Sequence, residues 1–454
     1  MRRTRQKVMR YPVTHTQRDL LERTLHPECK DDPRNSWVIS SATLVRPRVD
    51  LRRLRRAYQK LLDRHDSLRI QFEQDKNKWW AVIADQVDAP IEEVDIGDVD
   101  DDTFHREVVE IASAPMSLIG CAQVEIALLR CGARGDVVVW RINDSITDGF
   151  GNIVLVEDLL KYLIGMPVTG RAVSHAEYIG KYQDAPAHRV AEFDAFWEEM
   201  HRSPPLAPNI GRKAKGMPPN VLNCGAEPRR LSVVSSQNSV DRLRKRAAAA
   251  NTQFVSSLFA GFLEALCQNY AVEELLFSTN ASRVSPALAS FGGHATLYPI
   301  LRYKVAGTEG MEQAARSLGT SYMAAFQHSP AQALYKGSAL ERKLVEAGAY
   351  PRQFDCNLPN PSTLRDRSVF SDGLKKAPGE DTVFGGFAFS GIALPEFNWG
   401  PYDMMFRIDE TQGAEGFHLL YDGISFDETE VRHLADRICS LLDLDPDEFS
   451  TGSG

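Results

Sequence analysis

Residues 136–165, DVVVWRINDSITDGFGNIVLVEDLLKYLIG, decide the fold class of this chain. The first part, 136–144, is apolar enough to predict a strand that is buried on both faces. Apolar residues then recur at helical spacing from Phe150, and Gly165 is a typical helix stop. The stretch therefore predicts a buried strand, a short polar loop over 143–149 and a helix, a succession that is typical of α/β proteins.

The rest of the chain alternates between strand and helix patterns in the same way. Upstream, the sequence predicts strands at 37–45 and 124–130, a hairpin that includes 79–84, and an amphipathic helix over 50–68 whose arginines face water. Downstream, the predicted strands are 231–236, 274–280, 295–305 and 416–422, and the predicted helices are 239–249, 254–270, 310–327 and 428–444. Residues 350–400 show no regular pattern and are predicted to be irregular.

Composition and charge exclude several classes of function. The 454 residues carry a net charge of −8, from 53 basic and 61 acidic side chains, which does not favour binding to nucleic acid. No apolar run reaches the roughly 18 residues of a membrane span, and no apolar segment of a secretion signal follows the basic residues 1–10. The seven cysteines are scattered without a CxxC pair, which argues against a zinc site or a disulfide framework. These features predict a cytoplasmic protein.

A break in composition divides the chain. Residues 203–228 hold six prolines and little apolar periodicity, which predicts a crossing segment or linker. The order of strands and helices is similar on both sides of this segment. We therefore predict two related α/β subdomains, 1–180 and 181–446, followed by a linker-like tail at 447–454.

Six short motifs, in the right order, resemble the condensation domains of nonribosomal peptide synthetases, which are related to chloramphenicol acetyltransferase. The most specific motif is LLDRHDSLRIQF (61–72), which matches the family pattern Arg-His-x-x-Leu-Arg-x-x-Phe. The others are YPVTHTQRDLL (11–21), LLFSTNASR (275–283), FGGHATLYPILRY (291–303), DCNLP (355–359) and LLYDGISFDETEV (419–431). The resemblance runs nearly end to end. It implies an α/β fold of two chloramphenicol-acetyltransferase-like subdomains, arranged as a V-shaped pseudo-dimer with a channel between them.

The central motif departs from the family pattern. Condensation domains carry His-His-x-x-x-Asp-Gly on the loop after the buried strand, and this chain has Asn143 and Asp144 in the two histidine positions. Asp148 and Gly149 match the family. The resemblance implies that Asp148 forms a structural ion pair with Arg283 under the loop. The heterocyclisation pattern, Asp-x-x-x-x-Asp, fits poorly because its first position is Asn143.

Asp144 stands where the family has its second histidine, which faces the acceptor nucleophile as a base or positioning group. One hypothesis makes Asp144 a substitute base, or an acceptor that orients an attacking amine, with Asn143 beside it. An aspartate has an ordinary pKa near 3.9, so burial and the nearby Asp148 would have to raise its pKa for this role. The alternative hypothesis is that the loop has drifted and the site is inactive.

Three further residues enter the candidate site through the resemblance. His294 lies in a segment that is expected to line the channel, where it could supply an imidazole from the wall opposite the loop. A structural or solvated histidine is the alternative. Ser145 and Trp399 are expected along the substrate channel, Trp399 either as a packing residue or as an aromatic contact for a bound acyl chain. No metal site is predicted.

The resemblance implies a condensation-type acyltransferase of nonribosomal peptide or hybrid polyketide biosynthesis. Such a protein condenses an acyl or aminoacyl thioester, held on an acyl or peptidyl carrier protein, with a small-molecule amine acceptor. No cofactor is expected to be bound by the chain itself, because the phosphopantetheine arm belongs to the carrier proteins. Two alternatives stay open: an inactive condensation-like domain that binds carriers or recruits a partner enzyme, and a free-standing acyltransferase that uses CoA.

Overall fold

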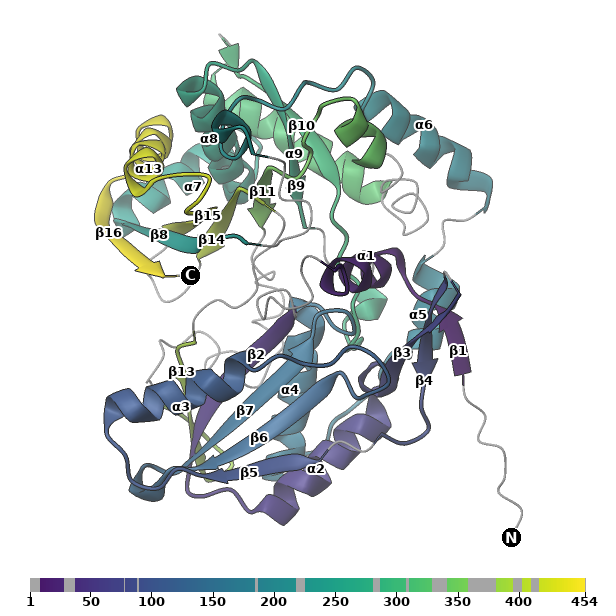
Figure 1. Ribbon diagram of the computed structural model, residues 1–454. Helices are drawn as coiled ribbons and strands as arrows, with labels where there is room; N and C mark the ends of the chain where they lie inside the picture. Colours follow the sequence, from purple (N-terminus) through teal and green to yellow (C-terminus); the bar gives the residue numbers. More distant parts are fainter. Residues whose placement is uncertain are drawn as a thin grey trace. The chain divides into compact units, whose positions relative to one another are not determined.

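The computed structural model describes residues 9–27, 37–76, 78–87, 90–183, 187–217, 225–280, 286–307, 310–328, 341–357, 381–394, 402–409 and 416–453. The chain forms two compact units, each assembled from separate stretches of sequence (Figure 1). Unit 1 consists of Met1–Gln183, Ser285–Ala295 and Asn360–Asn398, and unit 2 consists of Asp184–Val284, Thr296–Pro359 and Trp399–Gly454. Within the described part of the chain, no helix has both the length and the apolar character needed to cross a bilayer.

Unit 1 is built on a six-stranded sheet with the order β12-β13-β2-β7-β6-β5. β5 is parallel to β6, and the other neighbours are antiparallel. The strands are β2 Val38–Arg46, β5 Ile91–Asp95, β6 Val124–Arg130, β7 Asp136–Asn143, β12 Thr382–Phe384 and β13 Phe387–Ile392. A smaller sheet, in the order β1-β4-β3, contains β1 Met9–Pro12, β3 Ile70–Asp75 and β4 Lys78–Ile83.

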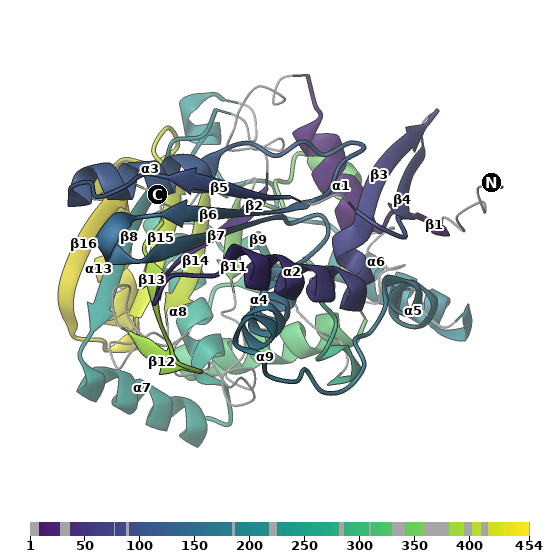
Figure 2. The same ribbon diagram turned by 90° about the horizontal axis from the view of Figure 1, so that it is seen from below.

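The strand β7 is buried on both faces, as its sequence predicts. On one face, α2 (Leu51–Arg64) and α4 (Gly149–Ile164) lie side by side (Figure 2) and pack against Trp140 and Ile142. On the other face, α3 (Asp101–Ser113) packs in a cluster with Val137 and Val139. The unit also contains α1 His15–Thr24 and α5 His175–Tyr178.

The predicted stop of α4 is confirmed at Gly165. This residue has a φ of 81°, a left-handed conformation that glycine adopts without a steric penalty. Its backbone N–H donates to the carbonyls of Lys161 and Tyr162 and so closes the last turn of the helix.

Unit 2 is built on a seven-stranded sheet with the order β10-β9-β11-β14-β15-β8-β16. β11 is parallel to both β9 and β14, and the other pairs are antiparallel. The strands are β8 Pro228–Ser235, β9 Glu274–Thr279, β10 Ile300–Lys304, β11 Phe354–Asn357, β14 Met404–Asp409, β15 Gly416–Asp422 and β16 Pro446–Ser453. The helices are α6 Val190–Met200, α7 Gln237–Ala249, α8 Phe254–Asn269, α9 Met311–Gln327 and α13 Glu428–Leu442. Residues of each of these helices join one apolar core with one face of the sheet.

The two units share a supersecondary arrangement, which agrees with the similar order of elements in the two halves of the sequence. In unit 1, β7 lies between β2 and β6 and leads directly into α4. In unit 2, β15 lies between β8 and β14 and leads directly into α13. The predicted α/β fold class is confirmed.

Two sequence predictions need correction. The stretch 350–400, which was expected to be irregular, contains β11, β12 and β13, and β13 pairs with β2 in a register that places Ala388 opposite Arg46. Most of the expected tail at 447–454 belongs to β16, which pairs with β8 at the edge of the second sheet. Short strands and polar edge strands lack a long apolar alternation, so the sequence pattern did not reveal them.

Candidate functional site

The loop between β7 and α4 is held in place mainly by hydrogen bonds of its own backbone N–H and carbonyl groups. The N–H of Asn143 donates to the carbonyl of Gln123 at 2.9 Å, and the N–H of Asp144 donates to the carbonyl of Trp37 at 2.7 Å. The side-chain oxygen of Asn143 accepts from the N–H of Ser145 at 2.9 Å, and its carbonyl accepts from Ile146 at 3.1 Å. These bonds form an Asx turn, a geometry that Asn and Asp favour.

Asp148 joins this loop to two other segments. Its Oδ1 accepts from the N–H of Gly151 at 2.6 Å, which caps the N-terminus of α4, and Gly149 is the first residue of that helix. Its Oδ2 accepts from the N–H of Ala295 at 2.9 Å. The carboxylate is 2% exposed. Asp148 therefore fixes the end of segment 291–295 against the start of α4.

His294 lies directly on the loop. Its Nδ1 is 2.6 Å from the carbonyl oxygen of Asp144 and 3.1 Å from that of Thr147. Carbonyl oxygens only accept hydrogen bonds, so Nδ1 carries a proton and Nε2 of the neutral ring carries the lone pair. The Asp144 Oδ1 atom is 4.0 Å from the same Nδ1. The loop thus places one carboxyl group and one oriented imidazole next to each other.

Gly292 lets segment 291–295 approach α4 closely enough to place His294, and Gly293 leaves room for the ring of Phe291. A Cβ atom at Gly292 would lie 2.5 Å from Leu155 of α4 and 3.0 Å from Nδ1 of His65. A Cβ atom at Gly293 would lie 2.2 Å from the ring of Phe291. A contact as short as that with Leu155 requires a shift, so a side chain at Gly292 would displace either the end of Leu155 or the segment itself.

The Arg-His pair of the 61–72 motif forms part of the support beneath this segment. Asp158 of α4 accepts from Nε of Arg64 at 2.9 Å, and its Oδ2 is 2.8 Å from Nε2 of His65. All three side chains are largely buried. The pair holds the end of α2 to α4, and its histidine contacts the segment that carries His294.

The pKa of Asp144 is raised to about 6. Burial is the largest cause, since it disfavours the charged form, and the negative charge of Asp148 raises the pKa further. The nearby His294 acts in the opposite direction. The side chain is nevertheless 16% exposed, so a carboxyl group with a pKa close to neutral pH remains partly accessible.

Unit 2 contains a second copy of this loop, which shows which features belong to the fold. After β15, the N–H of Ile424 donates to Oδ1 of Asp422 at 3.1 Å, and the N–H of Ser425 donates to the carbonyl of Asp422 at 2.9 Å. Asp422 thus repeats the Asx turn of Asn143. The position that corresponds to Asp144 is Gly423, so the turn itself does not require a carboxyl group at Asp144.

The structure brings most of the predicted site residues together. Asn143, Asp144, Ser145, Asp148, Gly149 and His294 all belong to unit 1 and lie on the loop or against it. Arg283 and Trp399 lie outside the described residues. His294 was expected on the wall opposite the loop, but it contacts the loop backbone directly. Ser145 is 1% exposed, and its hydroxyl has no hydrogen-bond partner among the described residues.

The sequence did not reveal the residues that position the site through backbone contacts and close packing. These are Trp37 and Thr147, which contribute backbone carbonyls, and the packing pair Gly292 and Gly293. A backbone contact leaves no signal in side-chain chemistry. The adjacent glycines before His294 are the one signal that could have indicated a close approach.

None of the described residues forms a group of three or more His, Cys, Asp or Glu side chains that could hold a metal ion.

Comparison with known proteins identifies the family. A model of the condensation domain matches residues 7–444. The chain belongs to the condensation-domain family. Surfactin synthase subunit 1 of Bacillus subtilis (strain 168) is 24% identical over 198 residues, which are 43% of this chain and 5% of that protein. Tyrocidine synthase 3 of Brevibacillus parabrevis is 19% identical over 245 residues, 54% of this chain and 4% of that protein. The matched stretches of this chain thus span about a twentieth of the length of these relatives.

Solved structures show the same fold. The SgcC5 protein from Streptomyces globisporus matches with a TM-score of 0.72 and 19% identity, over 95% of this chain and 98% of that one. The X-domain in complex with OxyB from teicoplanin biosynthesis has a TM-score of 0.73 and 16% identity, over 97% and 93%. A four-domain nonribosomal peptide synthetase, AB3403, has a TM-score of 0.75 and 14% identity, over 97% and 33%. This condensation domain is related to proteins of nonribosomal peptide synthesis.

Proposed function

We propose that this condensation domain joins a carrier-bound acyl or aminoacyl thioester to an amine acceptor, with Asp144 and His294 as its acid–base pair. The observation that carries the proposal is the contact of His294 with the 144–147 loop, because it supplies an imidazole where the family's own histidines are missing. The membership in the condensation-domain family and the relation to nonribosomal peptide synthetases support the choice of substrates.

The proposed reaction needs only modest help from a base. The amine nitrogen forms a bond to the thioester carbonyl carbon, the C–S bond breaks, and the proton lost by the nitrogen ends on the thiol that leaves. A positioned base contributes about 10²- to 10⁴-fold to such a step, whereas holding the reactants together contributes effective molarities of about 10⁵ M or more. A free amine is already a good nucleophile, so the loss of the family histidines is better tolerated with an amine than with an alcohol.

For His294 to act as the base, the acceptor amine has to reach Nε2, which is a buried atom. With its proton on Nδ1 held by the two loop carbonyls, the neutral ring has its lone pair on Nε2. Asp144, whose pKa is raised to about 6, is mostly ionised at neutral pH, and its Oδ1 lies 4.0 Å from Nδ1 of the ring. In this scheme the phosphopantetheine arm is supplied by the carrier protein, and the chain binds no other cofactor.

Intact-protein mass spectrometry of loaded carrier proteins tests the proposal. The wild-type protein should move the acyl group from the donor carrier to an amine acceptor, with release of a free phosphopantetheine thiol. His294→Ala should reduce the rate by about 10²-fold or more. His433→Ala removes an exposed histidine on α13 of unit 2 and serves as the matched control, with an unchanged rate.

A wild-type protein that transfers no acyl group would overturn the proposed reaction. Full activity of both His294→Ala and Asp144→Asn would leave the reaction standing but remove the acid–base pair. Transfer from acyl-CoA, with no transfer from any carrier, would identify a free-standing acyltransferase instead.

One observation favours a second candidate function. Both family histidines are absent from the loop, and a structural relative of this chain, an X-domain, has been solved in complex with another protein, OxyB. A condensation-like domain without activity could bind carriers and recruit a partner enzyme. In that case carrier binding would persist in calorimetry, while no acyl transfer would occur with wild-type protein.

A further inference from the structure

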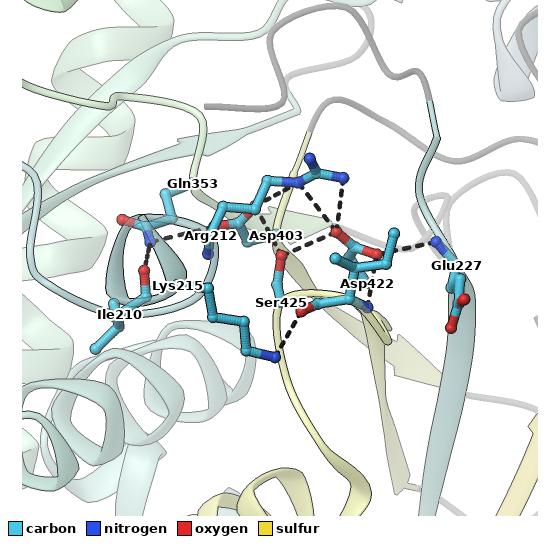
Figure 3. Close-up of polar contacts among 9 residues, drawn as sticks. Ile210, Arg212, Lys215, Glu227, Gln353, Asp403, Asp422 and Ser425 are labelled. Atoms are coloured by element: carbon cyan, nitrogen blue, oxygen red, sulfur yellow. Dashed lines mark hydrogen bonds and ion pairs between the residues drawn. The ribbon is translucent and has the colours of Figure 1, made fainter. Parts of the chain in front are cut away.

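In unit 2, the loop that corresponds to the candidate site is in contact with the side chain of Arg212. Arg212 comes from the proline-rich crossing segment and reaches the ends of β14 and β15, where Asp403 and Asp422 lie (Figure 3). Asp422 is the residue that repeats the Asx turn of Asn143. The comparison of the two units therefore places a guanidinium group beside the second copy of the loop.

The contacts of Arg212 are those of a cation in an acidic pocket. Its Nε donates to Oδ2 of Asp422 at 3.1 Å, and Nη2 lies 3.0 Å from the same oxygen. Nε is 3.8 Å from Oδ1 of Asp403. The backbone N–H of Arg212 donates to Oδ2 of Asp403 at 3.3 Å. Asp403 and Asp422 are fully buried, and Arg212 is 7% exposed.

The two carboxyl groups are oriented by neighbours that do not depend on Arg212. Oδ1 of Asp422 accepts from the N–H of Glu227 at 2.9 Å as well as from Ile424, and Oδ2 accepts from the hydroxyl of Ser425 at 2.9 Å. Nε2 of Gln353 donates to Oδ2 of Asp403 at 3.3 Å. A preformed pocket with two buried acids and one cation has an excess of negative charge, and buried charges of this kind require a positive partner.

The backbone around Arg212 is fitted to the same place. Gly211 has a φ of 58°, and a Cβ atom there would lie 2.5 Å from Oδ2 of Asp403. The carbonyl of Ile210 accepts from Nε2 of Gln353 at 2.9 Å, and Nζ of Lys215 donates to the carbonyl of Ile424 at 2.5 Å. Residues 210–215 therefore bind along the pocket as a short peptide ligand does, with Arg212 as the anchor.

We propose that the ends of β14 and β15 form a binding pocket for guanidinium-type cations, and that Arg212 is its built-in occupant. Within the described residues, the two similar loops have different neighbours: the copy in unit 2 has the guanidinium of Arg212 against Asp422, and the copy in unit 1 has His294 against its backbone carbonyls. The inference rests on contacts within unit 2 and is independent of the proposed reaction.

Chemical rescue of Arg212→Ala tests the pocket. The variant leaves the two acids without their cation and should unfold at a lower urea concentration than wild type at pH 7.5. Guanidinium chloride at 20 mM should then lower its unfolding equilibrium constant by about threefold if the dissociation constant is near 10 mM. Tetramethylammonium chloride at the same concentration should not do so, because this cation donates no hydrogen bonds.

Lys215→Ala is the matched control, because it removes a neighbouring cation and leaves Arg212 in place. Neither this variant nor the wild type should be stabilised by guanidinium, since their pockets are full. An equal response of Arg212→Ala to both cations would overturn the proposal, as would an equal response of all three proteins to guanidinium.

If Arg212→Ala does not fold alone, its refolding yield from urea gives the same test. Guanidinium at 20 mM should raise this yield above that obtained with tetramethylammonium. Equal yields with the two cations would contradict the presence of a guanidinium pocket.

Discussion

The carboxyl group of Asp144 is harder to ionise in the folded protein than in the unfolded chain. Its pKa rises from an ordinary value of 3.8 to about 6, mainly because the group is buried. A raised carboxyl pKa means that the folded state binds the proton more tightly, so folding stability falls as the pH rises from about 4 through 6. With about 1.4 kcal/mol for each pKa unit, the penalty at neutral pH is roughly 1–3 kcal/mol.

Asp144→Asn should therefore stabilise the protein and impair its reaction. The amide cannot ionise, so the free energy of unfolding at pH 7.5 should rise by about 1–3 kcal/mol, and the gain should shrink toward zero near pH 4. Urea unfolding at several pH values measures this effect. In the transfer assay, the wild-type rate should rise as the pH passes about 6, and the rate of the variant should be lower by about 10²-fold. Unchanged stability at pH 7.5 would show that the carboxyl group is not held in a buried environment.

Asn143 and Asp422 make the same turn, and this predicts which substitutions Asn143 tolerates. Asn143→Asp keeps an oxygen that can accept from the N–H of Ser145, as Asp422 does for Ile424, but it adds a buried charge close to Asp144 and should lower stability. Asn143→Leu leaves that buried N–H without its acceptor, at a cost of about 1–3 kcal/mol.

We expect Asn143→Asp to retain most of the wild-type transfer rate and Asn143→Leu to lose both rate and stability. Urea unfolding and the carrier assay distinguish these outcomes. A loss of rate in Asn143→Asp, measured on protein that remains folded, would instead give the amide of Asn143 a direct role in the reaction.

At the scale of elements, the two helices that follow the two loops begin with the same kind of cap in different surroundings. Asp148 caps α4 and also binds the N–H of Ala295, and it is buried. Asp427 caps α13 through the N–H of Glu430 at 2.9 Å, but it is exposed. The shared helix cap can therefore be separated from the additional anchoring of segment 291–295.

Asp148→Ala should destabilise the protein by about 2–4 kcal/mol, since it removes a cap and strands a buried N–H. Asp427→Ala should cost only about 1 kcal/mol, because water replaces its exposed contacts. Chemical denaturation of both variants measures the difference. Equal losses would mean that the bond to Ala295 contributes nothing to stability.

The sequence predicted the helices and strands that have strong apolar periodicity. It did not predict the strands whose pairing partners lie far away in the sequence. β7, α4 and the stop at Gly165 follow from local apolar spacing, and they lie where they were expected. β13 is six residues long and pairs with β2, more than 300 positions earlier, so no local pattern could indicate its partner. β16 has the polar sequence PDEFSTGS of an edge strand and resembles a linker in composition.

The same distinction applies to the candidate site. Asp144 and Asp148 were found because the Asp148-Gly149 pair matches the family motif and so locates the histidine positions, and local sequence carries that information. The orientation of His294 depends on Asp144 and Thr147 carbonyls about 150 positions away, and on glycines that allow close packing. Contacts of this kind are created by the tertiary fold, so the type of a residue alone did not reveal them.

At the scale of the whole molecule, unit 1 is assembled from three separate stretches of sequence, and we therefore predict that residues 1–183 cannot fold by themselves. Residues 1–183 lack β13, which covers the edge of β2, and they lack segment 285–295, which binds Asp148 and the loop. An uncovered strand edge is a site of aggregation.

We expect a fragment of residues 1–183 to be aggregated or poorly ordered in circular dichroism and size-exclusion chromatography. Co-expression with residues 184–454 should restore a soluble complex, because the missing strand is then supplied by the second fragment. A stable, monomeric 1–183 fragment with cooperative unfolding would contradict this view of unit 1.

The late position of β13 in the sequence also has a consequence for synthesis on the ribosome. β2 is complete at Arg46, but β13, which pairs with one of its two edges, emerges about 340 residues later. At about 5–20 residues per second, the nascent chain keeps this strand edge open for roughly 20 to 70 s. During that interval the growing polypeptide is vulnerable to premature association, so slow translation or a shortage of chaperones should reduce the yield of this protein more than that of a protein whose sheets close in sequence order.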